Sequence, residues 1–183
     1  MSHPSDQPAA RVFFALWPIV AERSQLAAWQ IPLQQLCGGR GMRSETLHNT
    51  LVFLGDVEQS RLEALQLAAL EISAVCFELY FDEARYWGHN HIVYAAPIYV
   101  PQLVQLVSAL EQRLTKHHFK FEQREYKPHV TLLRNAHWTD LPLPKMNSVC
   151  WQIHDFALVQ SVDQNGLAGY RVLARFPLMP SSG

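Results

Sequence analysis

The feature that most limits how this chain can fold is a four-residue pattern that occurs twice, nearly half the chain apart. The copies are His48–Leu51 (HNTL) and His129–Leu132 (HVTL). Apolar residues of strand character follow each copy, so both are predicted to lie on β-strands. Because side chains alternate along a strand, each His shares a face with the Thr two positions later. Two such strands, facing each other, would bring two imidazoles and two hydroxyls into one small space.

Two imidazoles and two hydroxyls are the smallest set of groups that could cleave a phosphodiester without a metal. Imidazole titrates near neutrality, so one ring can accept a proton while the other donates one. A single copy would more simply be a core His beside a strand Thr, but a pair on two strands favours a site. A third triplet, His137–Thr139, sits among Asn and Pro residues and is predicted to be a loop without a functional role.

Composition excludes several classes of protein. The net charge of −1 argues against broad nucleic-acid binding, which depends on neutralising many phosphates. No apolar run is long enough to span a bilayer, so no membrane association is expected. Cys37, Cys76 and Cys150 are widely spaced, which indicates neither a disulfide framework nor a zinc site. A reducing, cytoplasmic location is the resulting expectation.

The pattern along the chain predicts one bilobal domain over residues 1–183, of α+β class. Two antiparallel sheets are expected to face a central cleft, with helices outside and one H-x-T motif in each pseudo-symmetric lobe. Helices are predicted over residues 19–36, 60–72 and 101–117. Strands are predicted over residues 11–17, 48–54, 77–81, 92–95, 129–133, 156–160 and 170–176.

Several other polar groups have competing interpretations. His89-Asn90-His91 is more simply a polar hairpin turn than a metal site, and His154 a structural residue. Basic residues are frequent between Arg113 and Arg134. They could belong to a solvated helix end, or they could form a local binding site for a phosphate group.

With both motifs placed, the chain resembles the bacterial RNA 2′,3′-cyclic phosphodiesterases, or 2′-5′ RNA ligases, of the two-histidine phosphoesterase superfamily. The residues that carry the resemblance are Arg11–Leu16, Leu47–Gly55, Pro128–Arg134, Asp155–Val159 and Tyr170–Pro177. Two positions depart from the family pattern. Asn49 stands where an apolar residue is usual, with its side chain expected to point away from the cleft, and Trp17 stands where many relatives carry Asp.

The resemblance implies an enzyme that opens an RNA or nucleoside 2′,3′-cyclic phosphate to a 2′-phosphate, without cofactor or metal. His48 would be the proton donor to the leaving 3′-oxygen and His129 the proton acceptor from water. Thr50 and Thr131 would donate hydrogen bonds to the phosphate oxygens. Strict alternation puts Arg134 on the other face, so it can bind phosphate only if the strand ends or bulges by Leu133.

The remaining expectations concern partners and charge. Of the first strand's aromatic residues, Phe14 is predicted to stack on a base. Basic neighbours of His129 are expected to favour the neutral form that a base requires. The partner is expected to be an RNA 3′ end or a nucleotide with a cyclic phosphate, bound by a monomer. Two alternatives stay open, a reversible 2′-5′ RNA ligase and a binding module for RNA ends or nucleotides without turnover.

Overall fold

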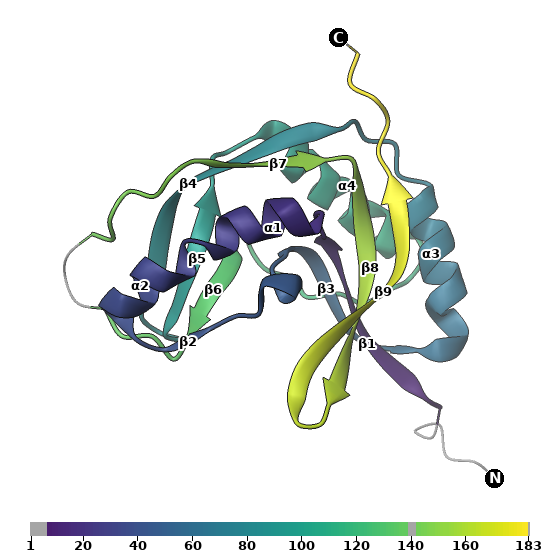
Figure 1. Cartoon of the computed structure of the whole chain (residues 1–183). Coiled ribbons are helices and arrows are strands. Elements are labelled where there is room, and N and C mark those ends of the chain that lie inside the picture. Colours follow the sequence, from purple (N-terminus) through teal and green to yellow (C-terminus); the bar gives the residue numbers. More distant parts are fainter. Residues whose placement is uncertain (1–6, 139–141, 183) are drawn as a thin grey trace.

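Two antiparallel sheets form the framework of the protein in a computed structural model, which describes residues 7–138 and 142–182 (Figure 1). One sheet has four strands in the order β3-β1-β8-β9, and the other has five in the order β2-β6-β5-β4-β7. The strands are β1 (Ala9–Leu16), β2 (Arg40–Gly41), β3 (Asn49–Glu58), β4 (Phe77–Trp87), β5 (Ile92–Pro97), β6 (Val130–Arg134), β7 (Val149–Ile153), β8 (Asp155–Gln164) and β9 (Leu167–Pro177). The predicted α+β class with two antiparallel sheets is confirmed.

Neither sheet is built from one half of the sequence. The sheet that contains β3, the strand of the first motif, is completed by the last hairpin of the chain, β8–β9. The sheet that contains β6, the strand of the second motif, is completed by the hairpin β4–β5 from the first half. The second motif strand, β6, therefore pairs with β2 and β5 from the first half of the chain, whereas β3 pairs with β1, which in turn pairs with β8 from the second half.

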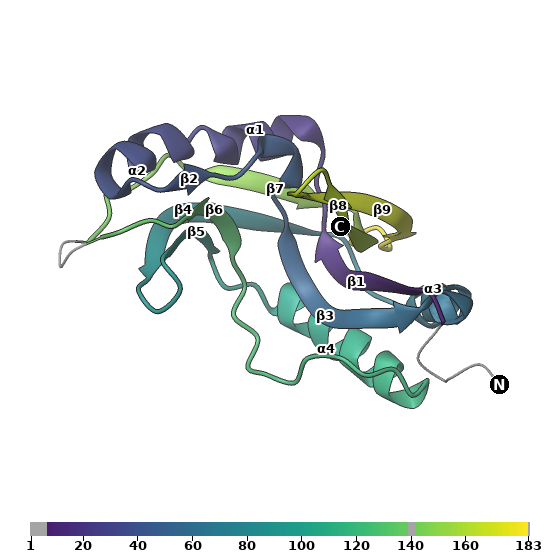
Figure 2. The ribbon, with the colours of Figure 1, turned by 90° about the horizontal axis from the view of Figure 1, so that it is seen from below.

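Helices cover the two sheets on different sides. The helices are α1 (Val20–Ala27), α2 (Gln30–Cys37), α3 (Leu62–Leu70) and α4 (Pro101–Lys116), with short 3-10 turns at Ser44–Thr46 and Gln59–Arg61. α1 and α2 pack against the five-stranded sheet, whereas α3 and α4 lie beside β3 and β9 of the other sheet (Figure 2). Among the described residues, no helix has the length and apolar character needed to cross a membrane.

Apolar periodicity explains how α4 is held. Its buried side chains recur at intervals of three and four residues, which places them on one face: Leu103, Leu106, Val107, Leu110 and Leu114. Pro101 at the start suits the first turn, where its missing N–H has no intrahelical partner. Truncating a leucine as buried as Leu110, which is 1% exposed, costs about 2–5 kcal/mol.

The predicted single helix over residues 19–36 is wrong, because it is two helices. α1 ends at Ala27 and α2 begins at Gln30. Pro32 gives the reason, since it has no N–H to donate to the carbonyl of Ala28 and its ring would clash there in a continuous helix. The break lets the buried Trp29 donate its indole N–H to the carbonyl of Asn147.

Candidate active site

The same irregularity follows the threonine of both motifs. In the pairing of β3 with β1, Thr50 and Val52 oppose consecutive residues, so that Leu51 is an extra residue. In the pairing of β6 with β5, Thr131 and Leu133 likewise oppose consecutive residues. Such bulges turn the next side chain to the other face of the strand. Each motif threonine is thus followed by two consecutive buried residues, and the third residue after it returns to the face of the His and the Thr.

The residues that return to that face are Phe53 after the first motif and Arg134 after the second. Both line the same cavity. The condition under which Arg134 could reach the site, a bulge at or before Leu133, is therefore met. Phe53 and Arg134 occupy equivalent positions, each five residues after the histidine of its motif. Simple alternation along a strand does not predict the bulges that bring both side chains to the cavity.

A cavity of about 180 Å³ lies between the two motif strands. The structure brings together in its wall five of the six predicted site residues: His48, Thr50, His129, Thr131 and Arg134. The other lining residues had no predicted role in the chemistry: Phe13, Met42, Thr46, Phe53, Ser161 and Tyr170. Tyr170 and Ser161 come from the hairpin β8–β9, whose pairing with the first-motif sheet is a tertiary feature without a local sequence signal.

Both histidines are oriented by an equivalent hydrogen bond. Nδ1 of His48 lies 2.6 Å from the carbonyl oxygen of Thr46, and Nδ1 of His129 lies 2.7 Å from that of Lys127. A carbonyl only accepts, so each Nδ1 carries the proton and donates it. Nε2 is then the nitrogen that exchanges protons in each ring, and it can act as a base when bare or an acid when protonated.

Aromatic rings surround both imidazoles. Trp17 stacks on His48 with ring centroids 5.1 Å apart and 22° between the planes, and Phe13 and Tyr170 lie at 5.1 and 5.3 Å. The ring of Trp87 meets His129 edge to face at 4.7 Å. These contacts fix ring positions and withdraw both imidazoles from water.

Burial lowers the pKa of both imidazoles. The pKa of His48 falls to about 4, mainly through desolvation, with His129, Arg134 and Arg23 adding positive charge against the Thr46 bond. The pKa of His129 is lowered by desolvation, then by Arg124 and Arg134, against the Lys127 bond. Arg124 and Arg134 thus favour the neutral form of His129, as expected, but positive charge lowers the pKa of His48 as well, so charge does not distinguish the base from the acid.

The predicted stacking role of Phe14 is also wrong. Its side chain is 0% exposed and packs against Phe156 and Phe176 in the main core. Alternation along β1 sends its neighbour Phe13 to the opposite face, where Phe13 lines the cavity. Trp17, the residue that departs from the family pattern, belongs to the Phe13 side and covers His48.

Asn49 points away from the cleft, as predicted, and is fully buried. Its Oδ1 accepts a 2.9 Å hydrogen bond from the hydroxyl of Tyr126. Burial raises the pKa of Tyr126, so this hydroxyl keeps its proton and donates. The polar residue at an apolar position is therefore paired with a tyrosine close to the second motif.

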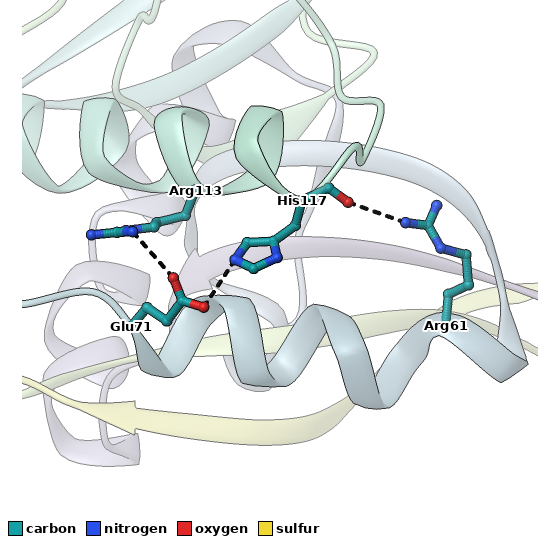
Figure 3. Close-up of polar contacts among 4 residues, drawn as sticks. All are labelled: Arg61, Glu71, Arg113 and His117. Carbon is teal, nitrogen blue, oxygen red and sulfur yellow. Dashed lines mark hydrogen bonds and ion pairs between the residues drawn. The ribbon is translucent and has the colours of Figure 1, made fainter.

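The basic stretch between Arg113 and Arg134 does not form one patch. Arg113 of α4 and His117, which directly follows α4, both bind the carboxylate of Glu71, at 3.1 and 2.9 Å, and Arg61 donates to the carbonyl of His117 (Figure 3). These contacts join α4 to the two ends of α3. Within this stretch, Arg134 lines the cavity between the motifs.

The other histidines that the structure describes lie outside this cavity. His89 and His91 belong to the turn between β4 and β5, as predicted, and His154 separates β7 from β8. His137 follows β6 in a segment without regular structure, while the rest of its triplet, from Thr139, lies outside the described residues. In the described part of the chain, no three His, Cys, Asp or Glu side chains are grouped as metal ligands would be.

Comparison with known proteins assigns the family. The sequence profile of the 2′-5′ RNA ligase superfamily matches residues 18–168. The RNA 2′,3′-cyclic phosphodiesterase of Escherichia coli (strain K12) is 31% identical over 170 residues, 92% of this chain and 96% of the relative. An enzyme of the same name from Archaeoglobus fulgidus is 26% identical over 143 residues, 71% of this chain and 80% of the relative.

Solved structures of similar proteins share the fold of this chain. The crystal structure of Escherichia coli LigT complexed with 3′-AMP superimposes with a TM-score of 0.83 at 28% identity, covering 93% of this chain and 99% of LigT. The protein TT0787 of Thermus thermophilus, at 21% identity, shares the fold with a TM-score of 0.77 over 94% of this chain and all of its own. With both motifs in one cavity and this match over most of its length, the chain belongs to the 2′-5′ RNA ligase superfamily.

Proposed function

We propose that this protein is an enzyme that hydrolyses the 2′,3′-cyclic phosphate of RNA 3′ ends or nucleotides to a 2′-phosphate. The observation that carries the proposal is the shared orientation of His48 and His129, each with Nδ1 on a backbone carbonyl and both in one cavity. The names of the relatives in Escherichia coli and Archaeoglobus fulgidus, RNA 2′,3′-cyclic phosphodiesterase, support the same substrate class.

In the proposed reaction, water attacks phosphorus in line with the 3′-oxygen. Nε2 of His129 takes the proton of the attacking water, and Nε2 of His48 gives a proton to the departing 3′-oxygen. The bond from phosphorus to the 3′-oxygen breaks and the 2′-ester stays intact, so one water is consumed and a 2′-phosphate is released. Acid and base catalysts placed in this way each contribute about 10²- to 10⁴-fold.

Three further side chains stabilise the charge that builds on the non-bridging oxygens. Thr50 and Thr131 share the cavity with the histidines and offer one hydroxyl donor each. Arg134 offers a charged fork that suits a phosphate. Proton transfer and charge stabilisation are both covered by these side chains, so the proposed reaction uses no cofactor or metal.

The lowered pKa of His48 places a condition on its role as the acid. In the free enzyme the imidazole is neutral near pH 7, because its pKa is about 4. The negative charge of a bound cyclic phosphate favours the protonated ring, as any nearby anion does. We therefore expect the imidazole of His48 to take up a proton when the substrate binds. In the free enzyme, Trp17 and Phe13 shield this imidazole from water and so favour its neutral form.

We also propose a location and an oligomeric state for the enzyme, namely that it works in the cytoplasm as a monomer. Size-exclusion chromatography with light scattering checks the monomer, for which the sequence mass is 20.9 kDa.

Product identification tests the proposed function. The purified protein is incubated with adenosine 2′,3′-cyclic phosphate and EDTA, and the products are separated as 2′-AMP and 3′-AMP. We expect 2′-AMP alone, and a loss of turnover of at least about 100-fold for His48→Ala and for His129→Ala. His154→Ala, an exposed His between two strands, is the matched control and should leave the rate unchanged. A 3′-AMP product, or activity that EDTA removes and a metal restores, would refute the proposal.

A further inference from the structure

The side chain of Arg134 reaches the cavity because β6 bulges at Leu132. Its guanidinium is exposed there, and among the described residues no carboxylate lies within ion-pair distance of it. Because no such carboxylate orients this side chain, its direction depends on the backbone of β6. A bulge re-aims a side chain only if the irregular backbone is itself held in place.

Gln30, the first residue of α2, holds this bulge. α2 lies against β2 and β6 (Figure 1), and the side chain of Gln30 is half-buried between them. Its Nε2 donates to the carbonyl oxygen of Met42 at 2.8 Å and to that of Leu132 at 2.9 Å. The side-chain amide nitrogen of glutamine carries two hydrogens, so the two carbonyls use both of them. Gln30 therefore ties the residue after β2 to the extra residue of β6.

Gly39, directly before β2, supports the backbone of Arg134 from the same side. A Cβ atom on Gly39 would lie 2.6 Å from the carbonyl oxygen of Arg134 and 2.9 Å from the amide nitrogen of Ala136. Both of these are backbone atoms, so neither could rotate away as the end of a side chain can. The φ of Gly39, +82°, is also one that glycine adopts without strain. The chain before β2 thus packs against Arg134 more closely than a residue with a side chain would allow.

We propose that Gln30 is a positioning residue for the phosphate site. It fixes the bulge at Leu132, and the bulge turns Arg134 to the face of the motif histidine and threonine. Arg134 then meets the phosphate through its guanidinium, which suits phosphate oxygens. The part played by Arg134 rests on the proposed function, whereas the hold of Gln30 on the bulge does not.

A double-mutant cycle on phosphate binding tests the proposal without relying on turnover. Inorganic phosphate is titrated into the wild type, Gln30→Met, Arg134→Ala and the double variant, and NMR signals of the His48 and His129 rings report binding. We expect Arg134→Ala to raise the Kd for phosphate by at least about tenfold, the loss of a hydrogen bond to a charged group. Gln30→Met should raise the Kd by at least about fivefold when Arg134 is present, and by less than about 1.5-fold when it is absent.

Two further substitutions on α2 sharpen the cycle. Gln35→Met is the matched control, because Gln35 is an exposed residue of the same helix, and it should leave the Kd for phosphate unchanged. Gln30→Asn keeps an amide but is too short to reach both carbonyls, so we expect a loss between those of the wild type and Gln30→Met. This milder variant repeats the cycle if urea unfolding shows that Gln30→Met is not folded.

The glycines before β2 provide a second matched pair. Gly38 and Gly39 both have a positive φ, so alanine is strained at either position. A Cβ atom on Gly38 meets nothing within 4 Å, whereas one on Gly39 meets the backbone of Arg134. We therefore expect Gly39→Ala to bind phosphate at least about threefold more weakly than Gly38→Ala.

Three outcomes would overturn the proposal. Equal weakening by Gln30→Met with and without Arg134 would mean that Gln30 supports the fold and not the arginine. Unchanged phosphate binding in folded Gln30→Met would remove its role, and the absence of phosphate binding by the wild type would remove that of Arg134. Failure of the wild type to hydrolyse a cyclic phosphate would refute the proposed function alone, since the phosphate cycle would still decide what Gln30 does.

Discussion

The hydroxyl of Tyr126 donates a 2.9 Å hydrogen bond to Oδ1 of Asn49 and lies 3.2 Å from the carbonyl oxygen of Thr50. Tyr126 precedes the second motif by three residues, and Asn49 directly follows His48. This one side chain therefore joins the two motif segments, which belong to different sheets. A second bond, from the amide of Glu122 to the carbonyl of Phe53, fastens the same loop to β3.

Removing this hydroxyl should destabilise the protein. In Tyr126→Phe, Oδ1 of the buried Asn49 loses its partner, and its Nδ2 already has no hydrogen bond. We expect a loss of about 1–3 kcal/mol in the free energy of unfolding, measured with urea. Tyr99→Phe is the control, because Tyr99 is 75% exposed. Adding Asn49→Leu to Tyr126→Phe should recover part of the loss, and equal stability of Tyr126→Phe and Tyr99→Phe would contradict this account.

Both motif threonines are expected to act through their hydroxyls. Thr50→Ala and Thr131→Ala should each raise the barrier to turnover by about 2–4 kcal/mol, the effect of removing one donor to a developing oxyanion. Thr→Ser variants keep the donor and should be milder in kcat measurements on a cyclic nucleotide. Thr115→Ala, on the exposed side of α4, is the control. Equal damage from Ser and Ala would assign the threonines to strand packing.

Stability should fall as pH drops from about 6.5 towards 4. The pKa of His48 is about 4 in the folded protein and about 6.5 when unfolded, so protons bind the unfolded chain first. His48 alone should remove about 2 kcal/mol of unfolding free energy between about pH 7.5 and pH 5. His129, whose pKa is also lowered, adds in the same direction. Urea titrations of the wild type and His48→Gln check this, and an equal pH dependence of the two proteins would contradict it.

The periodic elements could be predicted because their signals are local. The apolar face of α4 and the alternation in β4 placed both elements, although β4 continues to Trp87, well past the predicted end. The motif strands were also predictable, since His and Thr two apart share a face. Pro32 is a local signal for the break between α1 and α2, but the apolar spacing over residues 19–36 favoured one continuous helix.

The walls of the site were harder to predict, because they depend on bulges and on sheet order. The bulge at Leu51 brings Phe53 to the cavity, and the one at Leu132 does the same for Arg134. Whether Phe13 or Phe14 faces the cavity depends on which face of β1 packs against the main core. Tyr170 reaches His48 only because β8 pairs with β1. These are long-range pairings without a signature in neighbouring residues.

The central claim is that His48 and His129 divide the proton transfers between them, and one substrate tests it directly. In a nucleoside 2′,3′-cyclic phosphate with sulfur in place of the bridging 3′-oxygen, the leaving thiolate needs no acid. We expect this substrate to restore His48→Ala to within about tenfold of the wild-type rate, while His129→Ala stays at least about 100-fold slower. Rescue of His129→Ala in place of His48→Ala would reverse the assignment, and equal rescue of both, or of neither, would contradict the division of labour itself.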